Sequence, residues 1–130
     1  MDILLVDDNF PFPLVFESLL LGEGVTLRHC TDPEEALKAA AEQRPDLVMI
    51  EENLGSFSGL LLYRLMKLDT KVIVTSVVPP DSLLQQEMDD LNVNEFMLKP
   101  FAHYQLIPRI LRLLGRVEAG VTAEPMRMAA

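Results

Sequence analysis

The sequence has few of the features that mark secreted or membrane proteins. Cys30 is the single cysteine, which excludes an internal disulfide bond and fits a reducing compartment. No apolar run approaches the roughly 20 residues that a transmembrane helix needs. No basic stretch precedes the first apolar run, as it would in a signal peptide. We therefore expect a cytoplasmic protein that makes no contact with the membrane.

Basic residues are also scarce, because eleven Lys and Arg stand against twenty Asp and Glu, which gives a formal net charge of −9. Affinity for nucleic acid comes largely from cations that neutralise phosphates. Neither a basic patch nor an array of base-stacking aromatic residues is visible along the chain. This balance argues against direct binding of nucleic acid and is easier to reconcile with a site for a divalent cation.

The chain alternates short apolar runs with longer segments of helical periodicity. The predicted strands are residues 3–6, 25–30, 47–50, 72–74 and 95–98. The predicted helices cover about residues 13–21, 31–43, 60–68 and 82–91, and a last helix starts near residue 104. Strands and helices that alternate in this way predict an α/β fold, in which helices cover both faces of a parallel sheet. We expect residues 1–116 to form this domain and residues 117–130 to be a flexible tail or a truncated linker.

Polar side chains stand where the predicted strands end. In an open parallel sheet, ligands bind beyond the carboxyl ends of the strands. The residues at these ends are Asp7 and Asp8, Glu51 and Glu52, Thr75 and Ser76, and Lys99. Carboxylates suit Mg²⁺, and a hydroxyl and an ammonium group can hold phosphoryl oxygens. The ends of the strands therefore predict a pocket for Mg²⁺ and a phosphoryl group, with Glu52 as a solvated neighbour.

Four segments resemble the receiver domain of bacterial response regulators, in the same order and with nearly the family's spacing. They are residues 4–9, 32–37, 45–59 and 96–101. One such segment would be weak support, but four in register are specific. The resemblance covers residues 1 to about 116. It implies a flavodoxin-like (CheY-like) fold with five parallel strands in the order 2-1-3-4-5.

The resemblance also implies the roles of individual residues. The phosphoacceptor position falls on Glu51, three residues before Leu54, where the family carries an aspartate. Asp7 and Asp8 match the metal-binding acids of the family. Asn53 matches the position whose backbone carbonyl also faces the metal. The family pattern therefore implies Mg²⁺ as a possible cofactor, bound by these residues together with Glu51.

The remaining pocket residues are implied in the same way. Lys99 matches the lysine that pairs with the acceptor or its phosphate, and the Lys99–Pro100 bond is a candidate for the cis form. Phe96 matches the aromatic position that rotates on activation. Either Thr75 or Ser76 is the switch hydroxyl: Thr75 keeps the family's order of a hydroxyl before a small residue, and Ser76, which is slightly favoured, keeps the better spacing to Lys99.

Glu51 is the main departure from the family pattern. A glutamate carboxylate reaches one bond further than an aspartate, which is about 1.5 Å. Phosphoryl transfer depends on positioning, and a displacement of ~1 Å can cost about 10²-fold in rate. An ion pair between Glu51 and Lys99 could also imitate part of the phosphorylated state. The sequence therefore favours an atypical receiver, or pseudo-receiver, that does not use aspartyl phosphorylation.

The expected function is signal transduction by protein–protein contact, without enzymatic activity. The resemblance implies a contact face made by helix 82–91, strand 95–98 and the last helix, which could also form a homodimer. Expected partners are a histidine kinase, an output domain or another signalling protein. Two alternatives stay open: a working phosphorelay receiver that takes phosphate from a histidine kinase with Mg²⁺, and a dimerisation or interaction module with a vestigial pocket.

Overall fold

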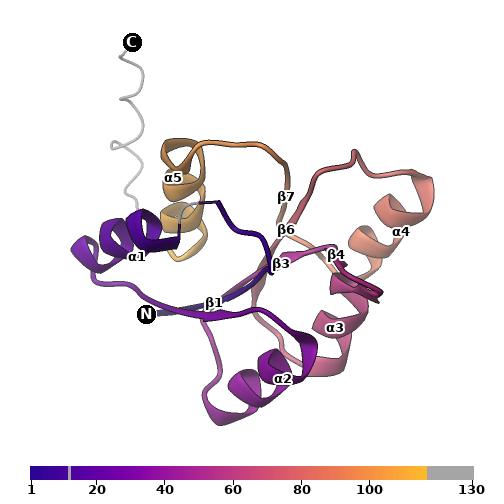
Figure 1. Cartoon of the computed structure of the whole chain (residues 1–130), viewed down its shortest axis with the longest axis horizontal. Coiled ribbons are helices and arrows are strands. Elements are labelled where there is room, and N and C mark those ends of the chain that lie inside the picture. The colour runs from indigo at the N-terminus through magenta and orange to yellow at the C-terminus, as the bar shows by residue number, and fades with distance from the viewer. Residues whose placement is uncertain (12, 117–130) are drawn as a thin grey trace.

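The computed structural model describes residues 1–11 and 13–116, and its centre is a parallel five-stranded sheet (Figure 1). The strands are β1 (Asp2–Val6), β2 (Thr26–Cys30), β3 (Leu47–Glu51), β6 (Lys71–Ser76) and β7 (Glu95–Leu98). They lie in the order β2-β1-β3-β6-β7, and every pair is parallel. This is the order 2-1-3-4-5 that the sequence predicts.

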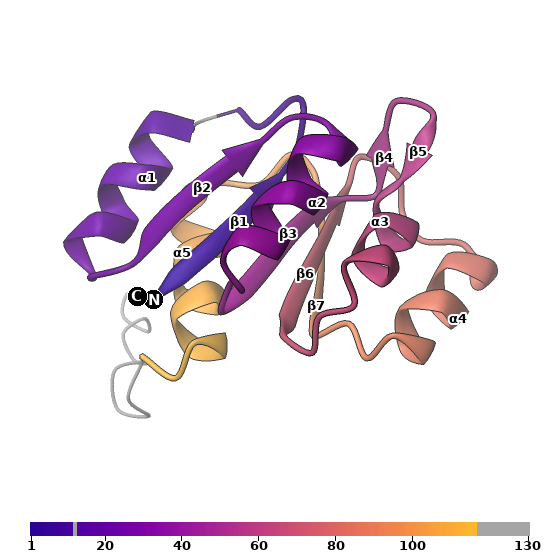
Figure 2. The same cartoon turned by 90° about the horizontal axis from the view of Figure 1, so that it is seen from below.

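Helices cover both faces of the sheet, as the alternating pattern predicts. The helices are α1 (Pro13–Gly22), α2 (Pro33–Glu42), α3 (Gly59–Met66), α4 (Ser82–Asp90) and α5 (His103–Leu113). One hydrophobic cluster joins the sheet to α1 and α5, and the other joins it to α2, α3 and α4. Figure 2 shows α1 and α5 on one side of the sheet and the other three helices on the opposite side.

The three central strands, β1, β3 and β6, contain continuous apolar runs that are buried on both faces. In β1, Ile3 and Leu5 belong to the cluster under α1 and α5, whereas Leu4 and Val6 belong to the cluster under the other helices. All four side chains are at most 1% exposed. Successive side chains of a strand point to opposite faces, so both sets of residues must be apolar.

Side-chain caps fix where two of the predicted helices begin. The Asp32 carboxylate accepts a hydrogen bond from the Glu35 amide at 2.8 Å, and Pro33 occupies the first turn of α2. The Asp81 carboxylate accepts from the Leu84 amide at 2.8 Å in the same way. Asp81 directly precedes residue 82, where the sequence predicts that this helix begins.

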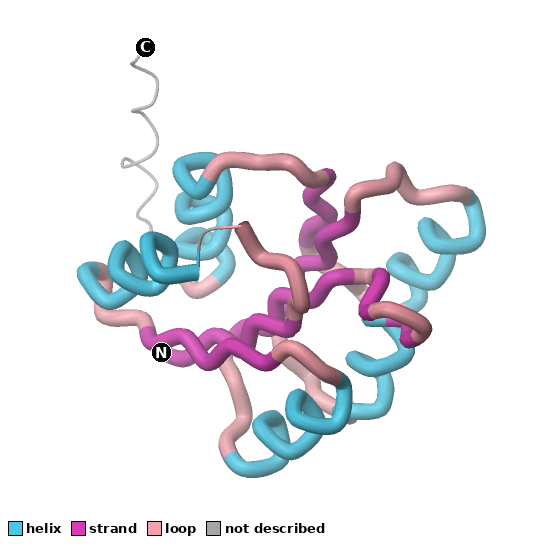
Figure 3. Tube along the Cα trace, viewed as in Figure 1, coloured by secondary structure: helices cyan, strands magenta, loops and turns pink. Residues whose placement is uncertain are grey.

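The segment between β3 and α3 differs from its prediction as a plain loop. It forms a short antiparallel hairpin of β4 (Asn53–Leu54) and β5 (Phe57–Ser58), in which Gly55 has φ 70°. Helix α3 then starts at residue 59 and ends at residue 66, instead of spanning 60–68. Strands and loops alternate with the helices along the rest of the chain (Figure 3).

Two further expectations concern the membrane and the end of the chain. Among the helices of the described part, none is long and apolar enough to cross a membrane. The predicted tail, residues 117–130, lies outside the residues that the structure describes.

Candidate functional site

The carboxyl ends of four neighbouring strands bring the predicted site residues together. Asp7 follows β1, Glu51 ends β3, Thr75 lies near the end of β6, and Lys99 follows β7. Strand register places Glu51 directly beside Thr75. The Asp7 amide donates to the Cys30 carbonyl at 3.1 Å, which continues the sheet by one residue. The site is therefore built on the rigid edge of the sheet.

Lys99 joins the two central carboxylates. Its Nζ lies 2.8 Å from Asp7 Oδ2 and 2.6 Å from Glu51 Oε1. The side chains of Lys99, Asp7 and Glu51 are 9%, 1% and 6% exposed. We call these three residues the Lys99 cluster. Because charges are costly to bury alone, the two ion pairs offset part of the cost of burying these three side chains.

The pKa of Lys99 reflects this balance. Burial acts to lower the pKa, but the hydrogen bonds and charges of Asp7 and Glu51 outweigh burial and raise it above the usual lysine value. Lys99 is therefore a cation throughout the physiological pH range.

The second oxygen of each carboxylate accepts a hydrogen bond from a backbone amide. The Asn9 amide donates to Asp7 Oδ1 at 2.8 Å, and the Asn53 amide donates to Glu51 Oε2 at 3.1 Å. Every carboxylate oxygen of the Lys99 cluster thus accepts a hydrogen bond from the chain itself. These contacts fix the orientation of both carboxylates.

The predicted metal ligands do not gather in this arrangement. Asp8 is exposed, and Asn53 contributes its amide to Glu51. Across residues 1–11 and 13–116, no three His, Cys, Asp or Glu side chains are arranged to hold a metal ion. Lys99 stands between Asp7 and Glu51, where a cation would need oxygens from both. In this side-chain arrangement, an Mg²⁺ ion bound by Asp7 and Glu51 would compete with the Lys99 ammonium group for their oxygens.

The other predicted pocket residues lie around the Lys99 cluster. Thr75 and Ser76 are 1% and 5% exposed, and Ser76 Oγ accepts a hydrogen bond from the Val78 amide at 3.1 Å. Phe96 is half-buried on β7 and packs against the cluster under α2, α3 and α4. The Lys99–Pro100 bond is cis, as the motif predicts.

Glu52 has a role that sequence reasoning missed. It is half-buried rather than solvated, and its carboxylate accepts hydrogen bonds from the Leu60 amide at 3.1 Å and from Ser58 Oγ at 3.3 Å. Burial raises the pKa of Glu52, against the opposing effect of these hydrogen bonds. The carboxylate therefore stabilises the start of α3, and the paired acids at 51 and 52 have different tasks.

Gly59 sets the distance between α3 and the end of β3. A Cβ atom at this position would lie 2.1 Å from the Glu51 carbonyl oxygen, so a larger residue cannot be accommodated unless the backbone moves. The Gly59 amide donates to the Glu52 carbonyl at 2.7 Å. The glycine of the Ser58–Gly59 pair thus allows the close approach that holds Glu51 in place.

Comparison with known proteins agrees with this geometry. The family model of the response regulator receiver domain matches residues 3–111. The DNA-binding response regulator MtrA of Mycolicibacterium smegmatis is 27% identical over 117 residues, which cover 89% of this chain and 51% of that protein. The uncharacterized transcriptional regulatory protein YkoG of Bacillus subtilis is 35% identical over 112 residues, which cover 83% and 48%. The chain spans about half the length of these relatives.

Solved structures show the same fold. A two-component response regulator from Clostridium difficile has a TM-score of 0.78 at 17% identity and covers 89% of this chain and 97% of that one. A receiver domain protein (CheY-like) from Methanospirillum hungatei JF-1 has a TM-score of 0.77 at 20% identity, with 88% and 93% covered. Because the family model matches most of its length, the chain belongs to the response regulator receiver domain family.

Proposed function

We propose that this receiver domain is a pseudo-receiver, which signals by protein–protein contact and does not use aspartyl phosphorylation. The observation that carries the proposal is the ion pair between Lys99 Nζ and Glu51 Oε1, at 2.6 Å inside a buried cluster. Glu51 stands where the family has its phosphoacceptor, and it forms an ion pair with the lysine that would otherwise pair with a phosphate.

The reach of glutamate supports this proposal. The extra methylene places the Glu51 carboxylate about 1.5 Å further from the backbone than an aspartate would reach. The carboxylate thereby brings one negative charge and two oxygens toward Lys99. This is a partial substitute for a phosphoryl group, and it holds the pocket in one state without an input.

The same contacts oppose phosphoryl transfer to Glu51. Each of its carboxylate oxygens already accepts a hydrogen bond or an ion pair, which draws electron density from the oxygen and makes it a weaker nucleophile toward a phosphoryl donor. Members of the family generally use Mg²⁺ at the phosphorylation site, but among the described residues no three acids converge on a metal position. Transfer depends on close positioning of the nucleophile, metal and donor, and two of these three are disfavoured.

Register favours Thr75 over Ser76 as the hydroxyl that belongs to this pocket. Thr75 is the direct neighbour of Glu51 across the β3–β6 ladder. The Ser76 hydroxyl is already used to accept the Val78 amide. We therefore assign to Thr75 the position of the family's switch hydroxyl, in spite of the better sequence spacing of Ser76.

The proposed contact face consists of α4, β7 and α5, as in the family resemblance. Leu83 on α4 is 77% exposed, Leu98 on β7 is 45% exposed and Tyr104 on α5 is 71% exposed. Large apolar side chains in solvent on three adjacent elements suit a protein partner. The expected partners are a histidine kinase, an output domain or another signalling protein, and a second copy of the chain is possible at the same face.

A comparison of the wild type with Glu51→Asp by NMR tests the proposal. Each protein is titrated with Mg²⁺ and then with beryllofluoride as a phosphoryl mimic, and the amide signals of Thr75, Phe96 and Lys99 are followed. Glu42→Asp, an exposed substitution with the same loss of one methylene, is the matched control. We expect no response to beryllofluoride in the wild type or the control and clear shifts in Glu51→Asp.

The other outcomes identify the alternatives. Equal responses of wild type and Glu51→Asp would contradict the proposal and indicate a working phosphorelay receiver with a longer acceptor. The absence of amide shifts with beryllofluoride in all three proteins would indicate an interaction module with a vestigial pocket. Stable incorporation of phosphate by the wild type from a small-molecule donor would also contradict the proposal.

A further inference from the structure

A second cleft lies at the opposite edge of the sheet from the Lys99 cluster. It has a volume of about 800 Å³, within the roughly 300–1,000 Å³ typical of ligand pockets. Its walls are the loops that lead into β3, β6 and β7, together with the end of α3. In Figure 2 these loops lie along the lower edge of the sheet. We call it the amino-edge cleft, because it lies at the amino ends of the strands.

The amino-edge cleft gathers positive charge in a strongly acidic chain. Arg44, Arg64, Lys67 and Lys71 line it, which is four of the eleven Lys and Arg residues in a sequence of net charge −9. None of these four forms an ion pair with a carboxylate of the described chain. Arg64, Lys67 and Lys71 lie close together in the sequence around the end of α3, and the fold adds Arg44 from the connection between α2 and β3.

Helix ends do not explain all of this charge. Arg64 lies in the last turn of α3 and Lys67 caps it, so both are placed where a cation favours the helix dipole. Lys71 instead begins strand β6, and Arg44 lies beyond the end of α2. The Arg44 guanidinium reaches across to the Asp69 carbonyl in the next loop. Two of the four cations therefore line the cleft for a reason other than helix capping.

A buried hydroxyl without a partner lies at the same place. Thr70 lines the cleft, and its Oγ1 is the one buried side-chain polar atom without a hydrogen-bond partner in the part of the chain that the structure describes. The Tyr63 hydroxyl donates to the Thr70 carbonyl at 3.0 Å, which fixes the backbone there. Buried hydroxyls almost always have a partner in folded proteins. A bound molecule with an acceptor oxygen would satisfy this one.

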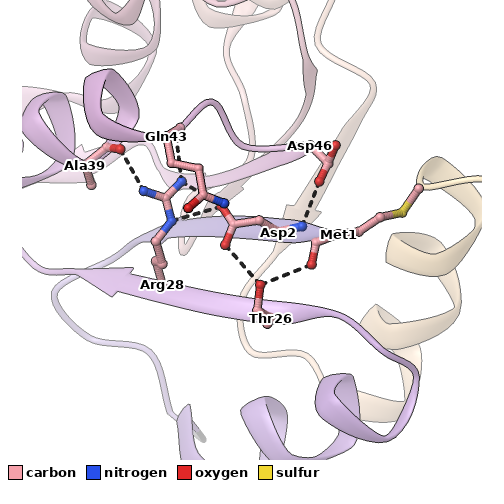
Figure 4. Close-up of polar contacts among 7 residues, drawn as sticks. All are labelled: Met1, Asp2, Thr26, Arg28, Ala39, Gln43 and Asp46. Carbon is pink, nitrogen blue, oxygen red and sulfur yellow. Dashed lines mark hydrogen bonds and ion pairs between the residues drawn. The ribbon is translucent and has the colours of Figure 1, made fainter.

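Three carboxylates line the cleft as well, and they do not form a cation site. Asp46 Oδ2 accepts a hydrogen bond from the Asp2 amide at 2.7 Å, and Figure 4 shows Asp46 in this contact. Asp90 Oδ1 accepts from Gln86 Nε2 at 3.0 Å. Together with Asp69 they make no metal-binding group among the described residues. The lining therefore carries four cations against three carboxylates, and two of these carboxylates already accept hydrogen bonds from the chain.

A polar network holds the rim of the cleft in place before any ligand binds. Arg28 pairs with Asp2 at 2.6 Å and donates to the Gln43 and Ala39 carbonyls at 2.8 Å and 2.7 Å (Figure 4). These contacts fix the connection that carries Arg44. A preorganised rim lowers the cost of ordering a site when a ligand binds.

We propose that the amino-edge cleft binds a small molecule with a diphosphate or triphosphate group. The four cations and the Thr70 hydroxyl match the several oxygens and the charge of such a group. Leu68 and Leu91 in the lining offer contact to a less polar part of the same molecule. This site goes beyond the pseudo-receiver function and does not depend on Glu51.

Pyrophosphate is the first probe, used without divalent cations and at constant ionic strength. Amide shifts of the ¹⁵N-labelled chain are followed by NMR, and ATP and adenosine are then compared. The test variant is Arg44→Gln/Lys71→Gln. The control is Lys38→Gln/Arg112→Gln, which removes the same charge from exposed positions outside the cleft. Thr70→Val removes the hydroxyl without a change of charge.

We expect saturable shifts at Thr70, Lys71 and Asn92 in the wild type, with ATP active and adenosine inactive. Loss of two charge-assisted contacts is expected to weaken binding about tenfold or more in the test variant, since ~1.4 kcal/mol corresponds to tenfold. Thr70→Val is expected to weaken it as well, while the control and Glu51→Asp bind as the wild type does. Shifts that do not saturate, or an equal loss of binding in test and control, would overturn the proposal.

Discussion

Removal of the central cation should destabilise the domain strongly. In Lys99→Met, the carboxylates of Asp7 and Glu51 stay 1% and 6% exposed but lose the ammonium group that pairs with both. An uncompensated buried charge of this kind typically costs about 3–5 kcal/mol. A small domain has a total stability of roughly 5–15 kcal/mol, so the loss is a large fraction of it.

Urea unfolding at pH 7, followed by circular dichroism, measures this loss. With a slope of about 2 kcal/mol per molar urea, the midpoint should fall by roughly 2 M. Lys38→Met removes an exposed lysine on α2 and is the control, expected to change stability by less than about 0.5 kcal/mol.

A double-mutant cycle tests this charge balance, because the sign of the stability change caused by Glu51→Gln should depend on whether Lys99 is present. In the wild type, Glu51→Gln removes an ion pair with Lys99 and should be destabilising. In the Lys99→Met background, the same change removes one of two uncompensated buried charges and should be stabilising. Additive effects in the cycle, or a loss below about 1 kcal/mol for Lys99→Met, would refute the view that the cluster balances its own charge.

Three further predictions concern the neighbouring residues. Burial raises the pKa of Glu52, so the folded state disfavours its ionisation. The free energy of unfolding should therefore fall as the pH rises from about 4.5 through the folded pKa. Glu52→Gln should remove this fall, which is measured by urea unfolding at pH 4 and pH 7. Gly59→Ala should cost about 1–3 kcal/mol in the same assay and shift the NMR signals of Lys99, because its Cβ meets the Glu51 carbonyl. Thr70→Val should leave thermal stability unchanged or raise it by about 1 kcal/mol, since a buried hydroxyl without a partner is lost.

The three central strands could be predicted from sequence because they are buried on both faces. Residues 95–98 are predicted as a strand and form β7 with the same bounds, although only Met97 of the four is fully buried. The short hairpin at residues 53–58 could not be predicted in this way, since its two-residue strands carry no periodic pattern. Its conformation depends on the contact of α3 with the end of β3.

The candidate site was predictable as far as its location, since strand ends converge in an open parallel sheet. The proposed choice of Thr75 over Ser76 rests on the register of β3 and β6, which spacing to Lys99 does not determine. The task of Glu52 also escaped prediction, because paired acids look alike in sequence and only their depth distinguishes them. The amino-edge cleft also escaped prediction, because only the fold shows that Arg44 lies beside Arg64, Lys67 and Lys71.

Charge balance links the substitution at the acceptor position to the rest of the pocket. Asp7 and Glu51 bring two negative charges to the buried cluster and Lys99 brings one positive charge, so one negative charge is left for the backbone amides of Asn9 and Asn53 to stabilise. A phosphoryl group would add further negative charge without a cation to match it, and a metal would have to share the oxygens that Lys99 holds. The longer side chain of Glu51 thus pairs with Lys99 inside the cluster and leaves no cation there for a phosphoryl group. An input to this domain is then more easily delivered at a surface that lies apart from the cluster, by a protein partner or at the amino-edge cleft.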